Sequence, residues 1–480
     1  MPKLPKTPSQ PVSGATTTTT TATASSSKMR ETHIQALLQV CSRGDADFLG
    51  RYLAAGGQID GVTDSAGRTP LHYCVYAADD VEKSRLRVPP PDESDALARV
   101  AGSEASPASG DEAGGRSDAR LACARLLLEA SPQLVDVRHV AGLTALHEAV
   151  MLGNLQLVRL LIAYGADVNS PTGAQASTAK WKTTRRKEEE LSDADGRTPL
   201  HLAVIYARPA IVHHLVTCEQ AVVNANLADS QTAYPLHYAV QLPQSGGSAT
   251  TSTPTPTSTS TSSSTPASTS GGIAAAVISW LVEAGRAGIE VRDSHGRTPL
   301  NWAATIGSVE SVRRLLELGA NTEARDEHGL TPMHCAASRG HTVALETMLK
   351  SVKAAGRRES DCVEARDRDG CTPLFYAVTM GRLETVRMLL SHGANAKHRD
   401  AKQRSLCHCA TRIRPGQTKA DVGHSNRLAT EMLRLVLAAG AEPWAANQQG
   451  CTPLHEACQM GNAAVVAELA LMTPEFVEGA

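Results

Sequence analysis

The six-residue signature Gly-x-Thr-Pro-Leu-His returns along most of this 480-residue chain and limits what the chain can fold into. The copies read GRTPLH at Gly67–His72, GLTALH at Gly142–His147, GRTPLH at Gly196–His201, GRTPLN at Gly296–Asn301, GLTPMH at Gly329–His334, GCTPLF at Gly370–Phe375 and GCTPLH at Gly450–His455. A period is evident from the Asp residues before them, since Asp293 and Asp326 lie 33 residues apart, as do Asp367 and Asp400. A fixed period of this length predicts a stack of similar units rather than one closed core.

The chemistry of one copy, Asp293–Ala324, explains why these residues recur. Asp293 and Gly296 favour a projecting turn, because Asp bonds its own backbone and Gly accepts a positive φ. Thr298 then caps a helix whose first residue is Pro299, where no N–H partner is lost. Apolar residues at spacings of three and four predict a second helix after the first. One such helix pair cannot bury both faces, so neighbouring units must stack.

On these residues the chain resembles the ankyrin-repeat family, over most of residues 34–479. The resemblance implies an all-α repeat fold, an ankyrin-type solenoid of helix-turn-helix units with short β-hairpin fingers. Nine signature units follow a degenerate opening unit at Ala36–Asp60. Two inner units are weak, because Thr232 and Gln403 stand in the glycine place of the finger. Both units keep their apolar helix residues and are expected to stack.

Irregular spacing elsewhere indicates a tail and inserts that are poor in apolar residues and are expected to be disordered. They comprise a Thr-rich tail at 1–30, an insert at 79–120, a charged finger insert at 170–192, a Ser/Thr/Pro-rich insert at 241–272, a short insert near 352–362 and a loop insert at 413–426. The solenoid itself is expected to be continuous across these interruptions.

Composition narrows the partners and the compartment. A net charge of -2 gives no general attraction to nucleic acid or acidic membranes. No apolar run at the start suggests a signal peptide, and none elsewhere is long enough to span a bilayer. The eleven cysteines mostly fall on helix positions, which favours a reducing environment without disulfides. We therefore expect a cytoplasmic or nuclear protein.

No catalytic or metal-binding constellation stands out, so no enzyme activity, cofactor or metal is expected. His398, Arg399 and Asp400 are similar to the start of a kinase catalytic loop, but Ser405 stands where that loop requires Asn. A metal cluster at Cys407, His408 and Cys409 would rest on a single Cys-x-Cys pair, and core packing explains these residues better.

The recurring signature histidine invites an acid–base interpretation. In the resembling family, however, this residue bonds backbone across neighbouring units and so ties the stack together. Asn301, which replaces it in one unit, can still make such a bond, whereas Phe375 cannot. A catalytic histidine would also not be copied into nearly every unit.

The resemblance places partner binding on the concave face, at the finger tips and the ends of the first helices. The residues expected to contact a protein partner are Tyr76, Met151, Leu152, Ile205, Tyr206, His295, Arg297, Ile306, His328, Arg339, Met380 and Met460. Exposed apolar and aromatic side chains in a groove are typical binding anchors. The alternative is that the insert at 170–192 folds over the first of them.

Two modification or targeting signals are weaker. The segment Leu161–Asn169 matches a pattern that favours hydroxylation of an asparagine in ankyrin-like repeats, which would fall on Asn169. The basic residues of Lys180–Lys187 resemble a nuclear import signal, but three glutamates follow at once and favour a solvated loop.

The last helix, Asn462–Met472, exposes an apolar side through Val465, Val466, Leu469 and Leu471. Either the tail with Phe476 covers this side or a second copy of the protein does. The protein is expected to be a monomer unless this face self-associates.

The function expected from these observations is a non-catalytic intracellular adaptor or scaffold that binds a protein partner through the groove. Two alternatives remain. One is a transcription-related regulator or inhibitor of the ankyrin type, since such proteins also consist of little beyond repeats. The other is the substrate-recruiting subunit of a ubiquitin ligase, although the eight residues after Met472 leave little room for a docking box. Neither identifies the partner.

Overall fold

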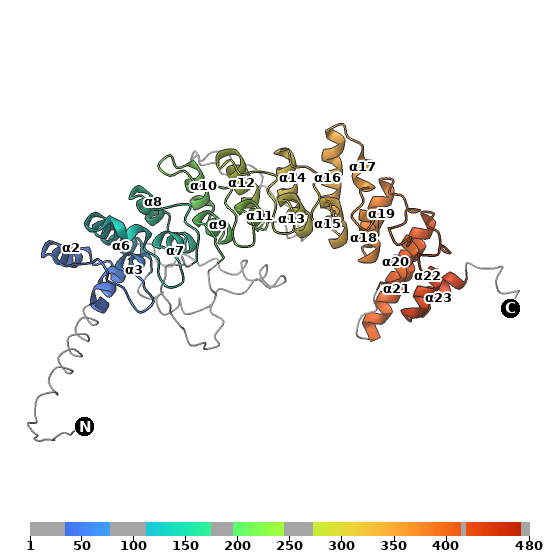
Figure 1. Cartoon of the computed structure of the whole chain (residues 1–480), viewed down its shortest axis with the longest axis horizontal. Coiled ribbons are helices and arrows are strands. Elements are labelled where there is room, and N and C mark those ends of the chain that lie inside the picture. The colour runs from blue at the N-terminus through green and yellow to red at the C-terminus, as the bar shows by residue number, and fades with distance from the viewer. Residues whose placement is uncertain (1–33, 77–111, 174–194, 244–271, 414–418, 472–480) are drawn as a thin grey trace, which may run out of the picture. The chain divides into compact units, whose positions relative to one another are not determined.

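The computed structural model describes residues 34–76, 112–173, 195–243, 272–413 and 419–471 (Figure 1). The chain divides into two compact units. Unit 1 comprises residues up to 167 together with residues 173–193, and unit 2 comprises residues 168–172 and 194–480. The described residues contain helices and turns and no β-strand.

Unit 1 is built from paired helices. Residues 34–43 are helical and are followed by α2 (Ala46–Ala54), α3 (Pro70–Val75), α6 (Glu112–Ala130), the 3-10 helix η2 (Pro132–Asp136), α7 (Ala145–Leu152) and α8 (Leu155–Ala163). The helices α3 and α7 pack on each other, and α6 packs on both α2 and α3. Leu127, Leu146 and Leu161 lie fully buried between them.

Unit 2 continues the same pattern in two layers. The first helices of its repeats are α9 (Pro199–Ile205), α11 (Pro235–Ala239), α13 (Pro299–Ile306), α15 (Pro332–Arg339), α18 (Pro373–Thr379), α20 (Leu406–Thr411) and α22 (Pro453–Gln459). We call these the inner helices. The outer helices are α10 (Pro209–Thr217), α12 (Ile273–Ser279) with the π-helical turn η3 (Trp280–Ala284), α14 (Val309–Glu317), α16 (Thr342–Ala354), α19 (Leu383–Ser391), α21 (Lys419–Ala438) and α23 (Ala463–Ala470). A short helix, α17 (Glu359–Val363), packs on α16.

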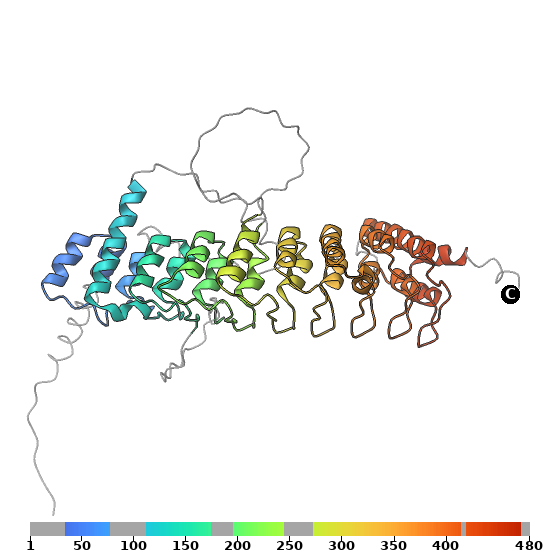
Figure 2. The same ribbon diagram turned by 90° about the horizontal axis from the view of Figure 1, so that it is seen from above.

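Each inner helix of unit 2 packs on the next inner helix, with α13 against α15 and α15 against α18. The finger turns project from the same edge of these helix pairs (Figure 2). Capping explains the regular start of the inner helices, because a Thr or Ser N-cap precedes most of them and Pro occupies the first helical position of all but α20. The predicted helix-turn-helix repeat is therefore confirmed.

The fingers are tighter than a β-hairpin with strands. The N–H of Asp293 donates to the carbonyl of Arg297 at 3.1 Å, and the N–H of Gly296 donates to the carbonyl of Asp293 at 2.9 Å. Neighbouring fingers share one backbone bond, as from Glu327 N–H to the His295 carbonyl at 3.0 Å. One bond per pair of fingers links them without forming a ladder.

Two helices begin inside segments that the sequence predicts to be inserts. Helix α6 begins at Glu112, within 79–120, and α21 begins at Lys419, within 413–426. Each helix has a well-buried turn further along, at Leu127 and Leu128 in α6 and at Met432 and Leu433 in α21. Once such a turn is packed, each residue added to the helix gains one backbone hydrogen bond, so the helix extends toward its N-terminus. The predicted C-terminal ends of these two inserts were therefore placed too far along the sequence.

Other insert boundaries also shift. Ser170 and Thr172, at the start of the insert expected at 170–192, are buried, and the N–H of Thr172 donates to the Arg197 carbonyl at 2.8 Å. Part of the insert expected near 352–362 forms the end of α16 and the start of α17. The rest of the tail and inserts, at 1–30, 79–111, 174–192, 244–271 and 414–418, lies outside the described residues.

Candidate functional site

A carboxylate at the base of each regular finger holds that finger together. Asp293 accepts hydrogen bonds from the N–H groups of His295 and Arg297, both at 2.9 Å. Its second oxygen accepts from the Trp302 Nε1–H at 2.8 Å. The same contact, between a finger Asp and an aromatic residue nine positions later, occurs for Asp64 with Tyr73, Asp229 with Tyr238 and Asp367 with Tyr376. We call this contact the finger latch, and the sequence analysis missed it although the spacing of nine is constant.

The signature histidines link successive units, as the resemblance implies. Nδ1 of His334 lies 2.8 Å from the Thr331 hydroxyl, and Nε2 lies 3.1 Å from the carbonyl of Cys371 in the next unit. His201 makes the equivalent contact to the Ala233 carbonyl at 3.2 Å. Burial lowers the pKa of both His201 and His334 to about 4. Both ring nitrogens of each are therefore occupied by structural partners.

The two exceptions behave differently. Asn301 donates from Nδ2 to the Leu330 carbonyl at 3.4 Å, so the amide keeps the link between units. Phe375 cannot donate, and it packs instead against the ring of His398, with centroids 5.7 Å apart. Nε2 of His398 lies 2.8 Å from the Gly370 carbonyl. The predicted difference between Asn301 and Phe375 is confirmed, and His398 supplies a link in the unit that lacks a signature histidine.

The residues considered for catalysis or metal binding have structural partners. Asp400 is a finger carboxylate that accepts from the N–H and the Nε–H of Arg404 at 2.7 and 2.6 Å. Cys407 and Cys409 are buried, and burial raises the pKa of their thiols to about 12 and about 11. Within the described ranges, no group of three or more His, Cys, Asp or Glu side chains is arranged to hold a metal ion.

In unit 1 the expected partner-binding residues lie at helix ends. Leu152, the last residue of α7, is 44% exposed, and Met151 is half-buried before it. Tyr76 follows α3 and donates its hydroxyl to Oε1 of Glu148 at 2.8 Å. Glu148 Oε1 also lies 3.2 Å from Nε2 of His139. The phenol of Tyr76 is therefore part of a buried polar cluster as well as of the surface.

In unit 2 the exposed apolar anchors share one repeat position on every second inner helix from α13. Ile306 ends α13 and is 41% exposed, whereas Met380 and Met460 follow α18 and α22 and are 53% and 37% exposed. Tyr206 holds the same position after α9, Ile205 is the last residue of α9, and both are half-buried. We call Ile306, Met380 and Met460 the apolar row.

The polar residues expected at the finger tips divide into two groups. His295, His328 and Arg339 have exposed side chains. Arg297 instead forms an ion pair with Asp293 at 2.8 Å and lies over the Trp302 ring, 5.2 Å from its centroid. Its guanidinium therefore contributes to the finger latch.

Asn169, the expected hydroxylation site, uses both ends of its amide. Nδ2 donates to the Val222 carbonyl at 2.8 Å, and Oδ1 accepts from the Asn224 N–H at 2.8 Å. Asn226 repeats this arrangement one unit later, with the Arg286 carbonyl and the Gly288 N–H. Hydroxylation of Asn169 stays a prediction.

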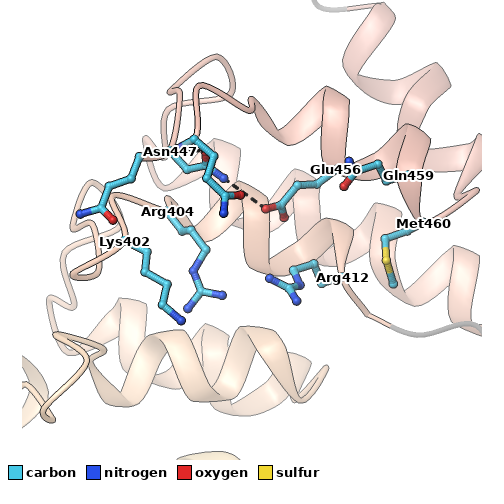
Figure 3. Close-up of a pocket in the computed structure, with 9 residues that line it drawn as sticks. Lys402, Arg404, Arg412, Asn447, Glu456, Gln459 and Met460 are labelled. Carbon is cyan, nitrogen blue, oxygen red and sulfur yellow. Dashed lines mark hydrogen bonds between the residues drawn. The ribbon is translucent and has the colours of Figure 1, made fainter.

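A cleft of about 540 Å³ lies in unit 2 between the last two repeats that the structure describes (Figure 3). It is lined by Lys402, Arg404, Arg412, Asn447, Gln448, Gln449, Glu456, Gln459 and Met460. We call it the terminal cleft. Met460 of the apolar row is its one apolar residue among these. The sequence analysis named only Met460, because the other lining residues are scattered over two fingers and two helices.

The terminal helix α23 is better covered than the sequence suggests. Val465 and Leu469 are fully buried, Val466 is half-buried and Leu471 is 81% exposed. On the side facing α21, Arg434 Nε donates to Glu468 Oε1 at 2.7 Å. The expectation of an open apolar side was therefore wrong for Val465 and Leu469. Whether the tail or a second copy covers Leu471 stays a prediction, since Phe476 lies outside the described residues.

Comparison with known families finds ankyrin repeats along the chain. A model of three consecutive ankyrin repeats matches residues 318–400, and single-repeat models match residues 141–173, 195–223, 295–327 and 449–472. The chain belongs to the ankyrin-repeat family. The matched segments hold the signature residues from which the resemblance was inferred, and the fold is the ankyrin-type helical repeat.

Curated ankyrin-repeat relatives match only part of the chain. Protein phosphatase 1 regulatory subunit 27 of Mus musculus is 36% identical over 83 residues, which are 17% of this chain and 40% of that protein. Notch-regulated ankyrin repeat-containing protein of Homo sapiens is 34% identical over 76 residues, which are 16% of this chain and 48% of that protein. The chain thus spans less than half the length of these two relatives.

A solved structure is also similar. The ankyrin repeat domain of Bcl-3, an IkappaB family member, matches 57% of this chain and 99% of its own at 26% identity, with a TM-score of 0.40. No described helix of this ankyrin-repeat protein has the length and apolar character needed to cross a membrane.

Proposed function

We propose that this ankyrin-repeat protein is a non-catalytic adaptor that binds a protein partner along the inner-helix face of unit 2. The observation that carries the proposal is the apolar row, in which Ile306, Met380 and Met460 are exposed at the same position of their repeats. Each ends or directly follows its inner helix, so the three exposed side chains lie at the same end of their helices. Exposed apolar side chains that repeat on one face are candidates for binding anchors.

The absence of a competing reaction site supports a binding role. The signature histidines are held by backbone and hydroxyl partners, and burial raises the pKa of Cys407 and Cys409 and so keeps these thiols protonated. A nucleophile requires the thiolate form, which a raised pKa disfavours. Among the residues described, these contacts favour recognition over catalysis.

The test is quantitative affinity capture from cells with full-length variants. Replacing Ile306, Met380 and Met460 together by Ser is expected to reduce partner capture more than tenfold, because anchor residues usually contribute about 2 kcal/mol or more each. The control replaces Val343, which is 57% exposed on the outer helix α16, by Ser. Helicity by circular dichroism is expected to stay unchanged in both variants. Equal capture by the folded triple variant and the control would reject the proposal.

A further inference from the structure

We propose that the terminal cleft binds an acidic peptide segment, with Lys402 and Arg412 receiving its carboxylates and Glu456 receiving an N–H donor between them. The inference rests on the proposed function and names the chemistry of the partner. Nine residues line the cleft, and eight of them are charged or polar. Recognition here must therefore depend on charge and hydrogen bonding more than on apolar burial.

The decisive group is the Glu456 carboxylate. Its side chain is 9% exposed, and Oε2 has no hydrogen-bond partner among the described residues. Oε1 accepts only a long bond, 3.5 Å, from Nδ2 of Asn447. A buried carboxylate with so few donors is costly, so a ligand donor that reaches this group from the cleft is favoured.

Glu148 shows how the same repeat position looks when it is purely structural. Both glutamates follow a signature histidine directly and lie nine residues after the first residue of their finger. Glu148 is 2% exposed, and its Oε1 contacts both Tyr76 and His139. Glu456 has only the weak Asn447 bond and faces a cleft instead. Oε2 of Glu148 also lacks a hydrogen-bond partner, so the two glutamates differ in the partners of Oε1 and in the cleft that Glu456 faces.

The cationic side of the cleft is not neutralised. Asp400 pairs with Arg404 at 2.6 Å, whereas neither Lys402 nor Arg412 forms an ion pair in the part of the chain that the structure describes. Both have exposed side chains. Figure 3 shows the Glu456 carboxylate directed toward the side of the cleft where the guanidinium groups of Arg404 and Arg412 lie. A ligand here meets free positive charges beside one buried acceptor.

An acidic peptide supplies both the carboxylates for the two cations and the hydrogen-bond donor for Glu456. Its carboxylates accept charge-assisted hydrogen bonds from Lys402 and Arg412, and a main-chain N–H lies within a few ångströms of them to serve Glu456. A nucleic acid backbone offers phosphate acceptors and no such donor, so Glu456 repels it. The volume of about 540 Å³ falls within the usual range of ligand sites, about 300–1,000 Å³.

The test measures fluorescence anisotropy of the full-length protein at low ionic strength, where exposed charges are least screened. The probes are labelled Gly/Ser peptides with two Glu residues around a central Gly, at several spacings. Matched probes carry Gln for Glu, or N-methylglycine for the central Gly. A labelled mixed-sequence single-stranded DNA tests for nucleic acid.

The best Glu peptide is expected to bind roughly tenfold more tightly than its Gln match, the effect of one charge-assisted bond. Arg412→Gln is expected to remove that preference, whereas Arg313→Gln, an equal change of charge on the outer helix α14, keeps it. N-methylation of the central Gly is expected to weaken binding about tenfold in the wild type and not at all in Glu456→Leu, which has no acceptor. Glu384→Leu, on an exposed side chain of α19, should retain the full effect of N-methylation.

Three results would overturn the inference. One is a Glu peptide that binds no better than its Gln match. A second is an N-methyl effect that is absent from the wild type or equal in Glu456→Leu and Glu384→Leu. The third is DNA that binds more tightly than the peptide and gains affinity in Glu456→Gln, which would assign the cleft to nucleic acid. Partner capture through the apolar row is measured separately, so either proposal can fail alone.

Discussion

The unit with His334 and the unit with His455 carry the same signature, yet they hold their polar groups differently. His334 is 1% exposed and contacts Thr331 and the Cys371 carbonyl of the next unit. His455 is exposed, and its Nδ1 lies 2.8 Å from the hydroxyl of Thr452 within its own unit. The same residue therefore serves stability in one unit and is open to solvent in the other.

The finger latch shows the same contrast. In the unit of α18, the Tyr376 hydroxyl donates to Asp367 at 2.7 Å. In the unit of His455, the corresponding pair is Asn447 and Glu456 at 3.5 Å. Where successive units pack fully, the repeat satisfies its own polar groups. In the last described unit, polar atoms remain for a partner, and the following predictions test this difference.

The largest expected effect is acid sensitivity. Burial lowers the pKa of His334 to about 4, below its unfolded value of about 6.5, so the unfolded chain binds the proton more readily. The stabilisation is complete above pH 6.5 and is lost as the pH falls toward 4, which amounts to about 3 kcal/mol for this one histidine. His334→Asn, which copies Asn301, should reduce the pH dependence measured by urea unfolding between pH 7 and pH 4, and His201 should supply part of what remains.

His455→Asn is the matched control for that experiment. Because His455 is exposed, the substitution should leave the pH dependence as in the wild type. The contrast between the two units would be removed if the free energy of unfolding of His334→Asn kept the wild-type pH dependence. It would also be removed if His455→Asn reduced that pH dependence.

The finger latch should give a smaller difference in free energy of unfolding. Tyr376→Phe removes the bond to the Asp367 carboxylate while keeping the ring that packs 5.7 Å from His334, and should cost about 1.5–3 kcal/mol. Glu456→Gln removes the charge from the acceptor of one long bond and should cost less than about 1 kcal/mol. Urea unfolding of the two variants measures both. Equal costs would mean that Glu456 is as structural as Tyr376.

The smallest effect concerns backbone strain in the two degenerate fingers. Thr232 and Gln403 occupy the glycine place at φ of 55° and 59°, a region that non-glycine residues rarely adopt. Thr232→Gly and Gln403→Gly should each raise the free energy of unfolding by up to about 1 kcal/mol. The gain should be larger at the β-branched Thr232. Destabilisation by both changes would show that the fingers do not need a left-handed residue.

Much of the fold could be predicted because local chemistry is repeated. The capping Thr, the Pro after it and the positive φ of residues such as Gly296 each follow from one signature. The different contacts of Asn301 and Phe375 could be predicted from whether each side chain can donate a hydrogen bond to the next unit. The starts of α6 and α21 could not be predicted, because helix extension depends on how well a later turn packs.

The candidate site was predictable only in part. Ile306, Met380 and Met460 could be found from their position in the repeat, and all three are exposed. The terminal cleft could not, because Lys402 and Arg412 come from a finger and a helix end that the sequence pattern does not relate. The burial of Glu456 also depends on tertiary packing, since a polar residue on a short helix is ordinarily expected to face water.

Hydrogen–deuterium exchange of the full-length protein, with and without the captured partner, tests the central claim most directly. If the inner-helix face of unit 2 binds the partner, protection should rise in the finger before α20, at the ends of α13 and α18, and in α22. The outer helices α14, α16 and α19 should exchange as in the free protein. Protection confined to those outer helices would contradict the account.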